Sequence, residues 1–485
     1  MSDSASRLPA PQDRISIPVR LAYGLGSLVN NLLGAAIGVM AIILNLGLGM
    51  NPAVVGTLMA IPRLTDALTD PIMGFISDRT RSRWGRRRPY IFIGALTSGL
   101  CFALLWQLPA GHSQDFYFWF FLIGSIVFYL AYTVYATPWV ALGYEMTPDY
   151  NERTRLMGVS NFMGQFAWVA APWFYVIMEN ERWFDKSVEG AKALAIVVGV
   201  FVALVGLVPA IFCRERMQNL ATEEPRGEAG ATEGGMRAMA RNFAEFFKGF
   251  AITIKFAPFQ KLCVATFLVF NGFMLVSSFS SYVIIYYVYG GDKDLGGKLM
   301  GWNGTVSAIA TFCVIPLVTW FSTRFGKRRA FFFAIGVSIF GYALKFFCYS
   351  KTEPLLLLVS TPFIAFGLGG LFTLMGSMVA DVCDLDELNT GSRREGMFGS
   401  IFWWMVKLGM ALALGLSGFL LNFTGFDVEL GGNQPENTLF LMRLLDVGVP
   451  IVASAIAIWA MAGYSLTEEK AREVRAQLEA RRGVV

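Results

Sequence analysis

Long apolar runs recur along almost the whole chain, and short polar segments separate them. A helix needs roughly 20 apolar residues to cross the hydrocarbon core of a bilayer, and about twelve of the runs are long enough. Glycine and proline occur inside these runs, as membrane helices tolerate because neighbouring helices satisfy the freed backbone groups. We therefore predict an all-α membrane protein with twelve transmembrane helices, near residues 21–46, 53–77, 89–108, 116–144, 156–178, 191–213, 258–289, 297–321, 329–349, 354–380, 396–423 and 438–464.

The composition agrees with this class. Of the 485 residues, 55% are hydrophobic and 15% are charged, whereas a soluble domain carries about 25% charged residues. The single histidine, His112, lies in a polar loop, and the cysteines form no CxxC pair. This pattern excludes a histidine-based catalytic triad or zinc site, and we expect a protein that is not an enzyme and holds no metal.

The distribution of basic residues predicts the orientation in the membrane. Cytoplasmic loops carry an excess of lysine and arginine, and such residues crowd the loops after the second and eighth runs, whereas the 424–437 loop is acidic. We therefore expect a multi-pass protein of a bacterial inner (cytoplasmic) membrane, with both termini in the cytoplasm. The basic residues of the two loops are Arg79, Arg81, Arg83, Arg86, Arg87, Arg88, Arg324, Lys327, Arg328 and Arg329.

One long polar break divides the chain. It begins as a linker with Gly, Pro and Glu, and continues with apolar residues at helical spacing between Arg and Lys, as in a helix lying at the membrane surface. We predict four segments: a six-helix bundle over 1–213, a cytoplasmic linker with an amphipathic helix over 214–257, a second six-helix bundle over 258–464 and a cytoplasmic tail over 465–485.

An internal repeat supports two six-helix halves. GRRR at 85–88 matches GKRR at 326–329, and NERTRLMG at 151–158 aligns with SRREGMFG at 392–399. Both matches have the same spacing of 241 residues (326 minus 85, and 392 minus 151) and fall in equivalent loops. Two six-helix pseudo-repeats resemble the major facilitator fold, in which the substrate site lies between the halves near the bilayer midplane.

Two carboxylates lie inside the second run, where charge is costly. Asp66 and Asp70 are four residues apart and share one helix face, as does Arg63. An ionised group costs about 2.5–3.5 kcal/mol at a helix centre. One interpretation is an internal ion pair between Arg63 and Asp66. The interpretation that we favour is a cation site, in which the carboxylate oxygens bind Na⁺ or a proton.

A lone basic residue lies deep in the eleventh run. Lys407 must face the bundle interior and find a partner, unless it snorkels to the interface. We predict that it is the counter-charge of Asp66 or Asp70, and that cation binding releases it and so couples ion occupancy to substrate binding. Arg443 and Asp446, three residues apart in the twelfth run, are instead expected to form a local pair.

Other polar residues are candidates for a gate and for solute contacts. Charged residues at the cytoplasmic helix ends are expected to form ion pairs that close that side in the outward-facing state. Most aromatic side chains in the runs will pack or line the interface, but sugars stack on rings and amides bond hydroxyl groups. The predicted gate residues are Glu145, Arg153, Asp381 and Arg394, and the predicted substrate-binding residues are Asn31, Tyr132, Trp139, Asn161 and Trp403.

The blocks that carry these residues resemble one transporter family. DALTDPIMGFISDRTRSRWGRRRP, YTVYATPWVALGYEMTPDYNERTRL and VADVCDLDELNTGSRREGMFGSIFWWMVKLG are similar to the regions around helices two, four to five and ten to eleven of the glycoside–pentoside–hexuronide:cation symporters. The resemblance implies a cation site of Asp66, Thr69, Asp70 and Thr133, with Lys407 as a coupling residue.

The resemblance is incomplete at the sugar contacts. The family has aspartates where this chain has Asn31 and Ala136, and an arginine where this chain has Asn161. Trp139 falls one place before the expected tryptophan position. The coupling residues are retained while the sugar contacts are not, which implies a related mechanism with a different substrate.

These features together predict a secondary active transporter. It would use a Na⁺ or H⁺ gradient to import a sugar, glycoside or small oligosaccharide by alternating access. The expected partners are that solute and the lipid bilayer, with no nucleic acid and no cofactor beyond the coupling ion, and we expect a functional monomer. Three alternatives stay open: a carrier of a lysolipid or another amphiphile on the same fold, a membrane enzyme acting on lipids, and a non-transporting sensor.

Overall fold

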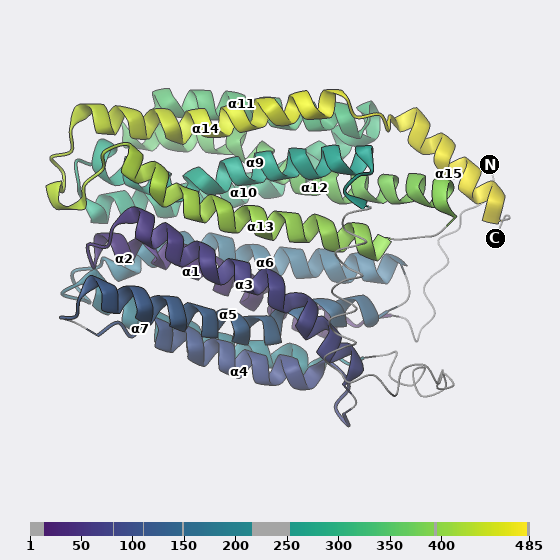
Figure 1. Ribbon diagram of the computed structural model, residues 1–485, viewed down its shortest axis with the longest axis horizontal. Helices are drawn as coiled ribbons and strands as arrows, with labels where there is room; N and C mark the ends of the chain where they lie inside the picture. The colour runs from purple at the N-terminus through teal and green to yellow at the C-terminus, as the bar shows by residue number, and fades with distance from the viewer. Residues whose placement is uncertain are drawn as a thin grey trace. The chain divides into compact units, whose positions relative to one another are not determined.

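Helices form all the regular secondary structure in the part of the chain that the structure describes (Figure 1). The computed structural model describes residues 14–80, 82–109, 111–147, 150–215, 253–391 and 395–482. The helices are α1 (Ile17–Met40), α2 (Ile42–Leu46), α3 (Pro52–Arg79), α4 (Arg88–Leu105), α5 (Gln114–Glu145), α6 (Tyr150–Met178), α7 (Ser187–Phe212), α9 (Ala257–Tyr282), the π-helix η2 (Val283–Val288), α10 (Lys293–Phe325), α11 (Lys327–Cys348), the 3₁₀ turns η3 (Pro354–Leu356) and η4 (Val428–Leu430), α12 (Leu357–Thr390), α13 (Glu395–Phe423), α14 (Glu436–Ala462) and α15 (Glu468–Arg482).

The described residues contain twelve long helical segments, when α1 with α2 and α9 with η2 are each counted as one. Ten of these segments are long and apolar enough to cross a membrane. The other two, α3 and α6, have 28 and 29 residues and therefore the required length, but they carry more polar and charged side chains. The predicted all-α, twelve-helix architecture is confirmed.

The helices differ from the predicted runs mainly at their polar ends. α6 begins at Tyr150 rather than 156, and α12 continues to Thr390 rather than 380. Both extensions are polar, and hydropathy marks only the part of a helix that faces hydrocarbon. The predicted surface helix falls largely on residues 216–252, which lie outside the described residues.

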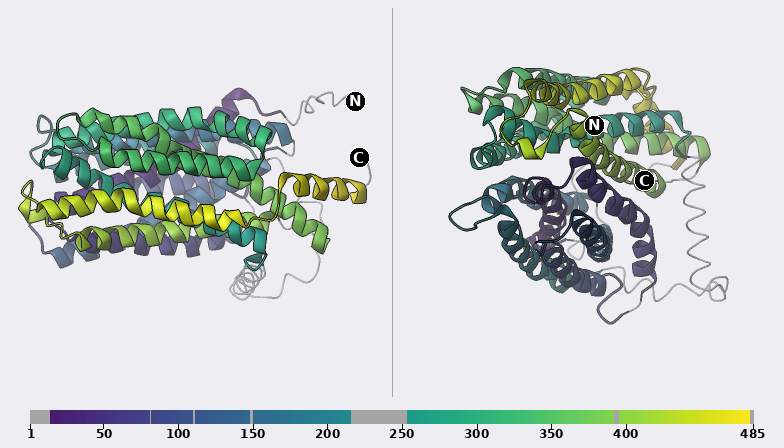
Figure 2. Two further views of the ribbon diagram at one scale, coloured as in Figure 1. Left: turned by 90° about the horizontal axis from the view of Figure 1, so that it is seen from above. Right: turned by 60° about the vertical axis from the view of Figure 1, so that its left-hand side comes forward.

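The chain divides into two compact units, whose helices lie side by side within each unit (Figures 1 and 2). Unit 1 comprises residues 1–48 and 61–235, and unit 2 comprises 49–60 and 236–485. In unit 1, α1 packs on α6, and α4 packs on both α5 and α7. In unit 2, α12 packs on α10 and α11, and α9 packs on α13 and α14. The four predicted segments, with boundaries at 213, 257 and 464, stay a prediction.

Small residues allow the helices of unit 1 to approach closely. A Cβ atom on Gly94 of α4 would lie 2.5 Å from the backbone nitrogen of Tyr135 in α5, and one on Gly199 of α7 would lie 2.5 Å from the carbonyl oxygen of Gly99 in α4. Such contacts are typical of membrane helices, whose association depends on van der Waals packing. α4 therefore holds α5 in place, and α5 carries half of the site described below.

A buried ion pair joins three helices of unit 2. Nζ of Lys345 in α11 lies 2.8 Å from the carboxylate of Asp446 in α14, and the two side chains are 8% and 0% exposed. The Tyr349 hydroxyl donates to the same carboxylate oxygen at 2.7 Å, and Lys345 also donates to the hydroxyl of Ser280 in α9 at 3.0 Å. Because Tyr349 and Ser280 also contact each other at 3.2 Å, the four side chains close a ring.

The predicted local pair of Arg443 with Asp446 is wrong. Arg443 donates to the carbonyl oxygen of Phe346 at 2.9 Å, and its guanidinium carbon lies 4.1 Å from the ring centre of Tyr287. Asp446 is fully buried, so its charge requires an equally buried partner, which a neighbouring helix supplies.

We expect Asp446→Asn to destabilise the protein strongly, because it leaves the Lys345 ammonium buried without its counter-charge. Removing one partner of a buried ion pair costs about 3–5 kcal/mol, whereas replacing both partners with apolar residues is often neutral. The melting temperature of the purified protein in detergent should therefore fall much further for Asp446→Asn than for Lys345→Met/Asp446→Leu. Equal losses for the two variants would contradict this ion pair.

Candidate functional site

Two carboxylate–hydroxyl contacts join α3 to α5 in unit 1. The Thr133 hydroxyl donates to Oδ1 of Asp66 at 2.9 Å, and the Thr137 hydroxyl donates to Oδ1 of Asp70 at 2.9 Å. Within each helix the two residues are four apart, and residues at this spacing lie on one face. The two helices therefore present matching rows of acids and hydroxyls to each other.

The Asp66 end of this contact is closed to solvent and rich in oxygen. Asp66 and Thr133 are 1% and 2% exposed. The Thr69 hydroxyl lies 3.2 Å from that of Thr133 and 3.3 Å from the backbone carbonyl oxygen of Asp66. Three of the four predicted cation-site residues therefore meet at one point, and the fourth, Asp70, lies one turn away and is partly buried. Hard cations take oxygen ligands of these kinds.

The Arg63 guanidinium contacts an aromatic ring. Its central carbon lies 5.0 Å from the ring centre of Tyr129 in α5, a cation–π contact. Its Nε atom is buried and has no hydrogen-bond partner among the described residues. The alternative interpretation of Arg63, an ion pair with Asp66, is therefore not the arrangement in this structure.

Two of the predicted solute-binding residues form side-chain hydrogen bonds within unit 1. The Tyr132 hydroxyl donates to Oδ1 of Asn30 at 2.8 Å, and Nδ2 of Asn31 lies 3.4 Å from the hydroxyl of Ser27 one turn earlier in α1. Both pairs retain further donor or acceptor capacity. A solute role for Tyr132 and Asn31 stays a prediction.

The other predicted solute contacts differ in exposure. Trp139 is 5% exposed, stacks on Tyr23 with ring centres 5.1 Å apart, and donates its indole N–H to the Tyr23 carbonyl oxygen at 3.2 Å. A solute role for Trp139 stays a prediction. Trp403 is 55% exposed and stacks on Phe372 within unit 2, and Asn161 is exposed.

Lys407 lies near the middle of α13 in unit 2 and is partly buried. Its predicted role as counter-charge of the α3 carboxylates stays a prediction. Among the described residues, no cluster of three or more His, Cys, Asp or Glu side chains could hold a metal ion.

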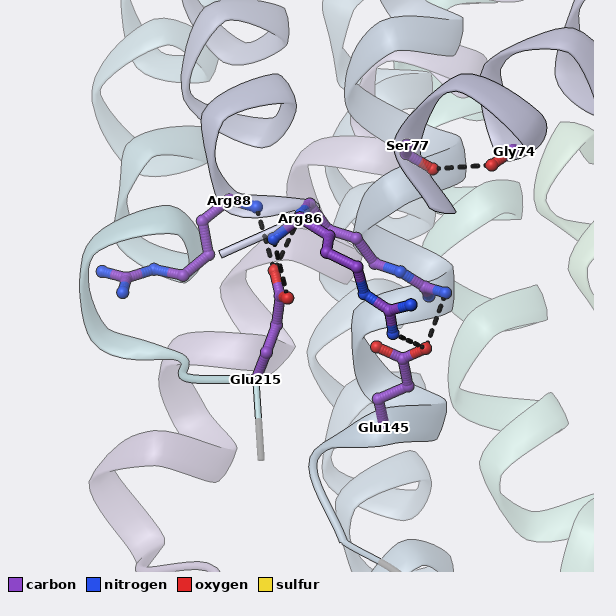
Figure 3. A network of polar contacts seen from close by, with 7 residues as sticks. Gly74, Ser77, Arg86, Arg88, Glu145 and Glu215 are labelled. Atoms are coloured by element: carbon purple, nitrogen blue, oxygen red, sulfur yellow. Dashed lines mark hydrogen bonds and ion pairs between the residues drawn. The ribbon is translucent and has the colours of Figure 1, made fainter. Parts of the chain in front are cut away.

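The predicted gate residue Glu145 pairs with the arginine loop of its own unit. This last residue of α5 lies 2.8 Å from both Arg86 and Arg87. Glu215, which follows α7, accepts from the backbone N–H groups of Arg86 and Arg87 at 2.8 and 2.7 Å (Figure 3). It also accepts from the N–H of Arg88, the first residue of α4, at 3.4 Å, and so caps the start of that helix. The two glutamates fix this loop at the end of unit 1.

The glycine that opens each basic motif has the same environment in both units. Gly85 has φ +105°, and a Cβ there would lie 2.7 Å from the carboxylate of Glu215. Gly326 has φ +88°, and a Cβ there would lie 2.9 Å from the carboxylate of Glu468 in α15. In each unit, the segment that follows the sixth helix supplies the acid, which supports the internal repeat.

The second half of the predicted gate is described in part. Asp381 of α12 lies 2.5 Å from Lys327 at the start of α11, within unit 2. The Arg153 side chain and Arg394 lie outside the described residues. Closure of the cytoplasmic side by these residues stays a prediction.

Sequence reasoning missed several residues of the site. The sequence could have indicated Thr137, because it follows Thr133 by the same four residues that separate the two aspartates. No sequence pattern indicates Tyr129 or Asn30, since aromatic and amide residues are frequent in these runs. Glu215 lies far from the loop that it caps, and nothing in its own neighbourhood indicates the pairing.

Comparisons with known proteins agree with this architecture. A family model described as MFS/sugar transport protein matches residues 22–468. The chain is 25% identical to sodium-dependent lysophosphatidylcholine symporter 1-A of Danio rerio, over 98% of this chain and 91% of that protein. It is 24% identical to the glucuronide carrier protein homolog of Escherichia coli K12, over 96% of each.

Solved structures share the fold. A bacterial homolog of the human lysosomal transporter Spinster, in an inward-facing and unoccupied conformation, superposes with a TM-score of 0.65 at 17% identity. The match covers 93% of this chain and 98% of that chain.

We expect Gly85→Ala to destabilise the protein more than Gly111→Ala. Both glycines have positive φ, +105° and +79°, so an alanine is strained at either position. Only at Gly85 does the new Cβ meet a neighbour, because nothing lies within 4 Å of a Cβ on Gly111. The difference between the two variants should be about 1 kcal/mol, the typical cost of losing a helix cap. Thermal unfolding in detergent measures it, and equal losses would contradict the Glu215 cap.

Proposed function

The chain belongs to the MFS/sugar transport protein family, and on that premise we propose that it is a Na⁺-coupled symporter of a glycoside or small oligosaccharide. The family and the relatives support the coarser statement directly: the protein is a multi-pass, cation-coupled major facilitator symporter and not an enzyme. The identity of the ion, the solute and the residues that bind them are our proposal.

The oxygen cluster between α3 and α5 carries the proposal for the ion. Asp66 is almost fully buried in a membrane helix, where an ionised group costs about 2.5–3.5 kcal/mol. A cation held by Asp66, Thr69 and Thr133 would offset that cost. The name of the Danio rerio relative, a sodium-dependent symporter, supports Na⁺ over H⁺.

Asp70 and Lys407 complete the proposed coupling machinery. Asp70 is more accessible than Asp66, so we assign it to receive the arriving cation and pass it one turn along α3. Lys407 balances the carboxylates in the empty carrier and is released when the cation binds. Binding then raises the population of a solute-competent state, which alternates between the two sides of the membrane.

A glycoside is the proposed solute. The family description names sugar transport, and the Escherichia coli relative is a glucuronide carrier homolog. Amide, hydroxyl and aromatic side chains suit a hydroxylated solute, and the proposed contacts are Asn31, Tyr132, Trp139, Asn161 and Trp403. A lysolipid is the second candidate, because the lysophosphatidylcholine symporter is as similar to this chain as the glucuronide carrier homolog is.

The remaining expectations become part of the proposal. The basic loops before α4 and α11 support a cytoplasmic location for those helix ends and for both termini. We also propose a bacterial inner-membrane location and a functional monomer.

We expect Asp66→Asn to abolish Na⁺-driven solute accumulation in proteoliposomes. Thr133→Val should raise the Na⁺ concentration at half-maximal uptake by about tenfold or more, because it removes a hydroxyl from a charged site. Thr137→Val should have a smaller effect, since its partner Asp70 is less buried. Uptake is measured with Na⁺ and pH varied separately.

Thr97→Val is the matched control, because the Thr97 hydroxyl in α4 bonds to the Ile93 carbonyl oxygen of its own helix. Unchanged accumulation by Asp66→Asn would contradict the site. Uptake that follows a pH gradient in the absence of Na⁺ would show that H⁺ is the coupling ion.

We expect saturable, Na⁺-dependent uptake from a panel of radiolabelled glycosides and disaccharides, and none of lysophosphatidylcholine. Counterflow in proteoliposomes measures exchange of each solute independently of the driving ion. If lysophosphatidylcholine alone exchanges, the second candidate replaces the first.

A further inference from the structure

An apolar groove lies on the surface of unit 1 between α4 and α5. Its volume is about 730 Å³, and its lining comes from the end of α4, between Cys101 and Leu105, and from the start of α5, as far as Val127. Gly124 lines it without a side chain, and a Cβ there would meet the buried Leu105 side chain at 2.9 Å, so these two residues form its floor. Proteins hold small molecules in cavities of this size.

The rims of the groove are apolar side chains that stand out from the protein surface. Leu104 is 56% exposed, and Trp119 and Ile123 are each 58% exposed. Both α4 and α5 are long and apolar enough to cross a membrane, so in a bilayer these rims are surrounded by lipid tails. An acyl chain is therefore the apolar group that the surroundings supply to fill the groove.

The groove is about as long as one leaflet of a bilayer is thick. Its lining on α5 extends from Asp115 to Val127, twelve residues further on (127 minus 115), which is about 18 Å of helix. Half of the hydrocarbon core of a bilayer measures about 15 Å. These lengths match one acyl chain of a lipid whose headgroup lies at the start of α5.

The headgroup end of the groove carries a negative charge. Asp115 is the one charged residue in the lining, is exposed, and lies in the first turn of α5, two residues after the N-cap Ser113. Among the residues that the structure describes, no basic side chain pairs with it. A carboxylate attracts an ammonium group, and a primary ammonium also donates charge-assisted hydrogen bonds to it, whereas a quaternary ammonium has no N–H to donate.

We propose that this groove is a binding site for phosphatidylethanolamine, a phospholipid with a primary ammonium headgroup. One acyl chain lies between α4 and α5, and the ammonium binds Asp115. The lipid is a bound component of the membrane and not the transported solute, so the inference goes beyond the proposed symport. Only the choice of leaflet rests on the proposed orientation, which puts the start of α5 on the outer side.

Trp119 provides a direct readout, because bromine atoms on an acyl chain quench a tryptophan that they touch. The protein is reconstituted in phosphatidylglycerol with a minor fraction of brominated phosphatidylethanolamine, phosphatidylcholine or phosphatidylglycerol. The Trp119 signal is the difference between the parent and Trp119→Phe. With about a tenth of the lipid brominated, unselective contact quenches about a tenth of this signal, whereas a tenfold preference, equivalent to one charge-assisted hydrogen bond, quenches about half.

We expect quenching of about half for brominated phosphatidylethanolamine and of about a tenth for the other two lipids, on the same tenfold scale. Asp115→Asn should reduce the first value to the level of the others, and Asp115→Glu should retain it. Trp320 of α10, which is 59% exposed, is the matched control tryptophan and should show no preference among the lipids.

A second control separates lipid binding from helix stability. An acid in the first turn also stabilises a helix through its dipole, and Asp294 occupies the same kind of position in α10. Asp294→Asn should therefore lower the melting temperature about as much as Asp115→Asn does in detergent without lipid, and should leave the quenching of Trp119 unchanged.

Three results would overturn the proposal. Equal quenching of Trp119 by all three brominated lipids would mean that the groove holds lipid without selection. Phosphatidylcholine as effective as phosphatidylethanolamine would overturn the assignment to a primary ammonium, and a preference that survives Asp115→Asn would overturn the role of that residue. Because quenching requires no transport, failure of the symport proposal would leave this result untouched.

Discussion

Ionised side chains within membrane-spanning helices are the constraint on which this structure depends, because each one must be paired or put to use. Unit 2 pairs its charges: Lys345 and Asp446 neutralise each other, and Tyr349 and Ser280 close the ring around them. Unit 1 treats Asp66 differently. There the neutral Thr133 hydroxyl donates to Oδ1 of Asp66, and the Thr69 hydroxyl lies 3.2 Å from that of Thr133. The first arrangement is an ion pair within the protein, whereas the second gathers oxygen atoms of the kind that hard cations take as ligands.

The two halves of the internal repeat share the glycine–glutamate contacts at their helix ends but not the charged residues inside their helices. Gly85 and Gly326, 241 residues apart, both have positive φ, and each lies beside a glutamate from the segment after the sixth helix of its half. The same spacing relates Asp66 to Ser307 and Asp70 to Thr311, and it relates Lys345 to Leu104 and Asp446 to Val205. The two halves therefore share a folding plan, while each has its own interior charges.

The sequence predicted the features that belong to a single helix and missed the contacts between two helices. Hydropathy located the spans, and the rarity of charge in hydrocarbon singled out Asp66 and Asp70. Periodicity shows which residues share a helix face but not which face of another helix they meet. Thr137 lies 67 residues from Asp70, and Lys345 lies on a different helix from Asp446, so both pairings required the packed structure. The stacking of Trp139 on Tyr23 likewise involves two helices and could not be read from either segment alone.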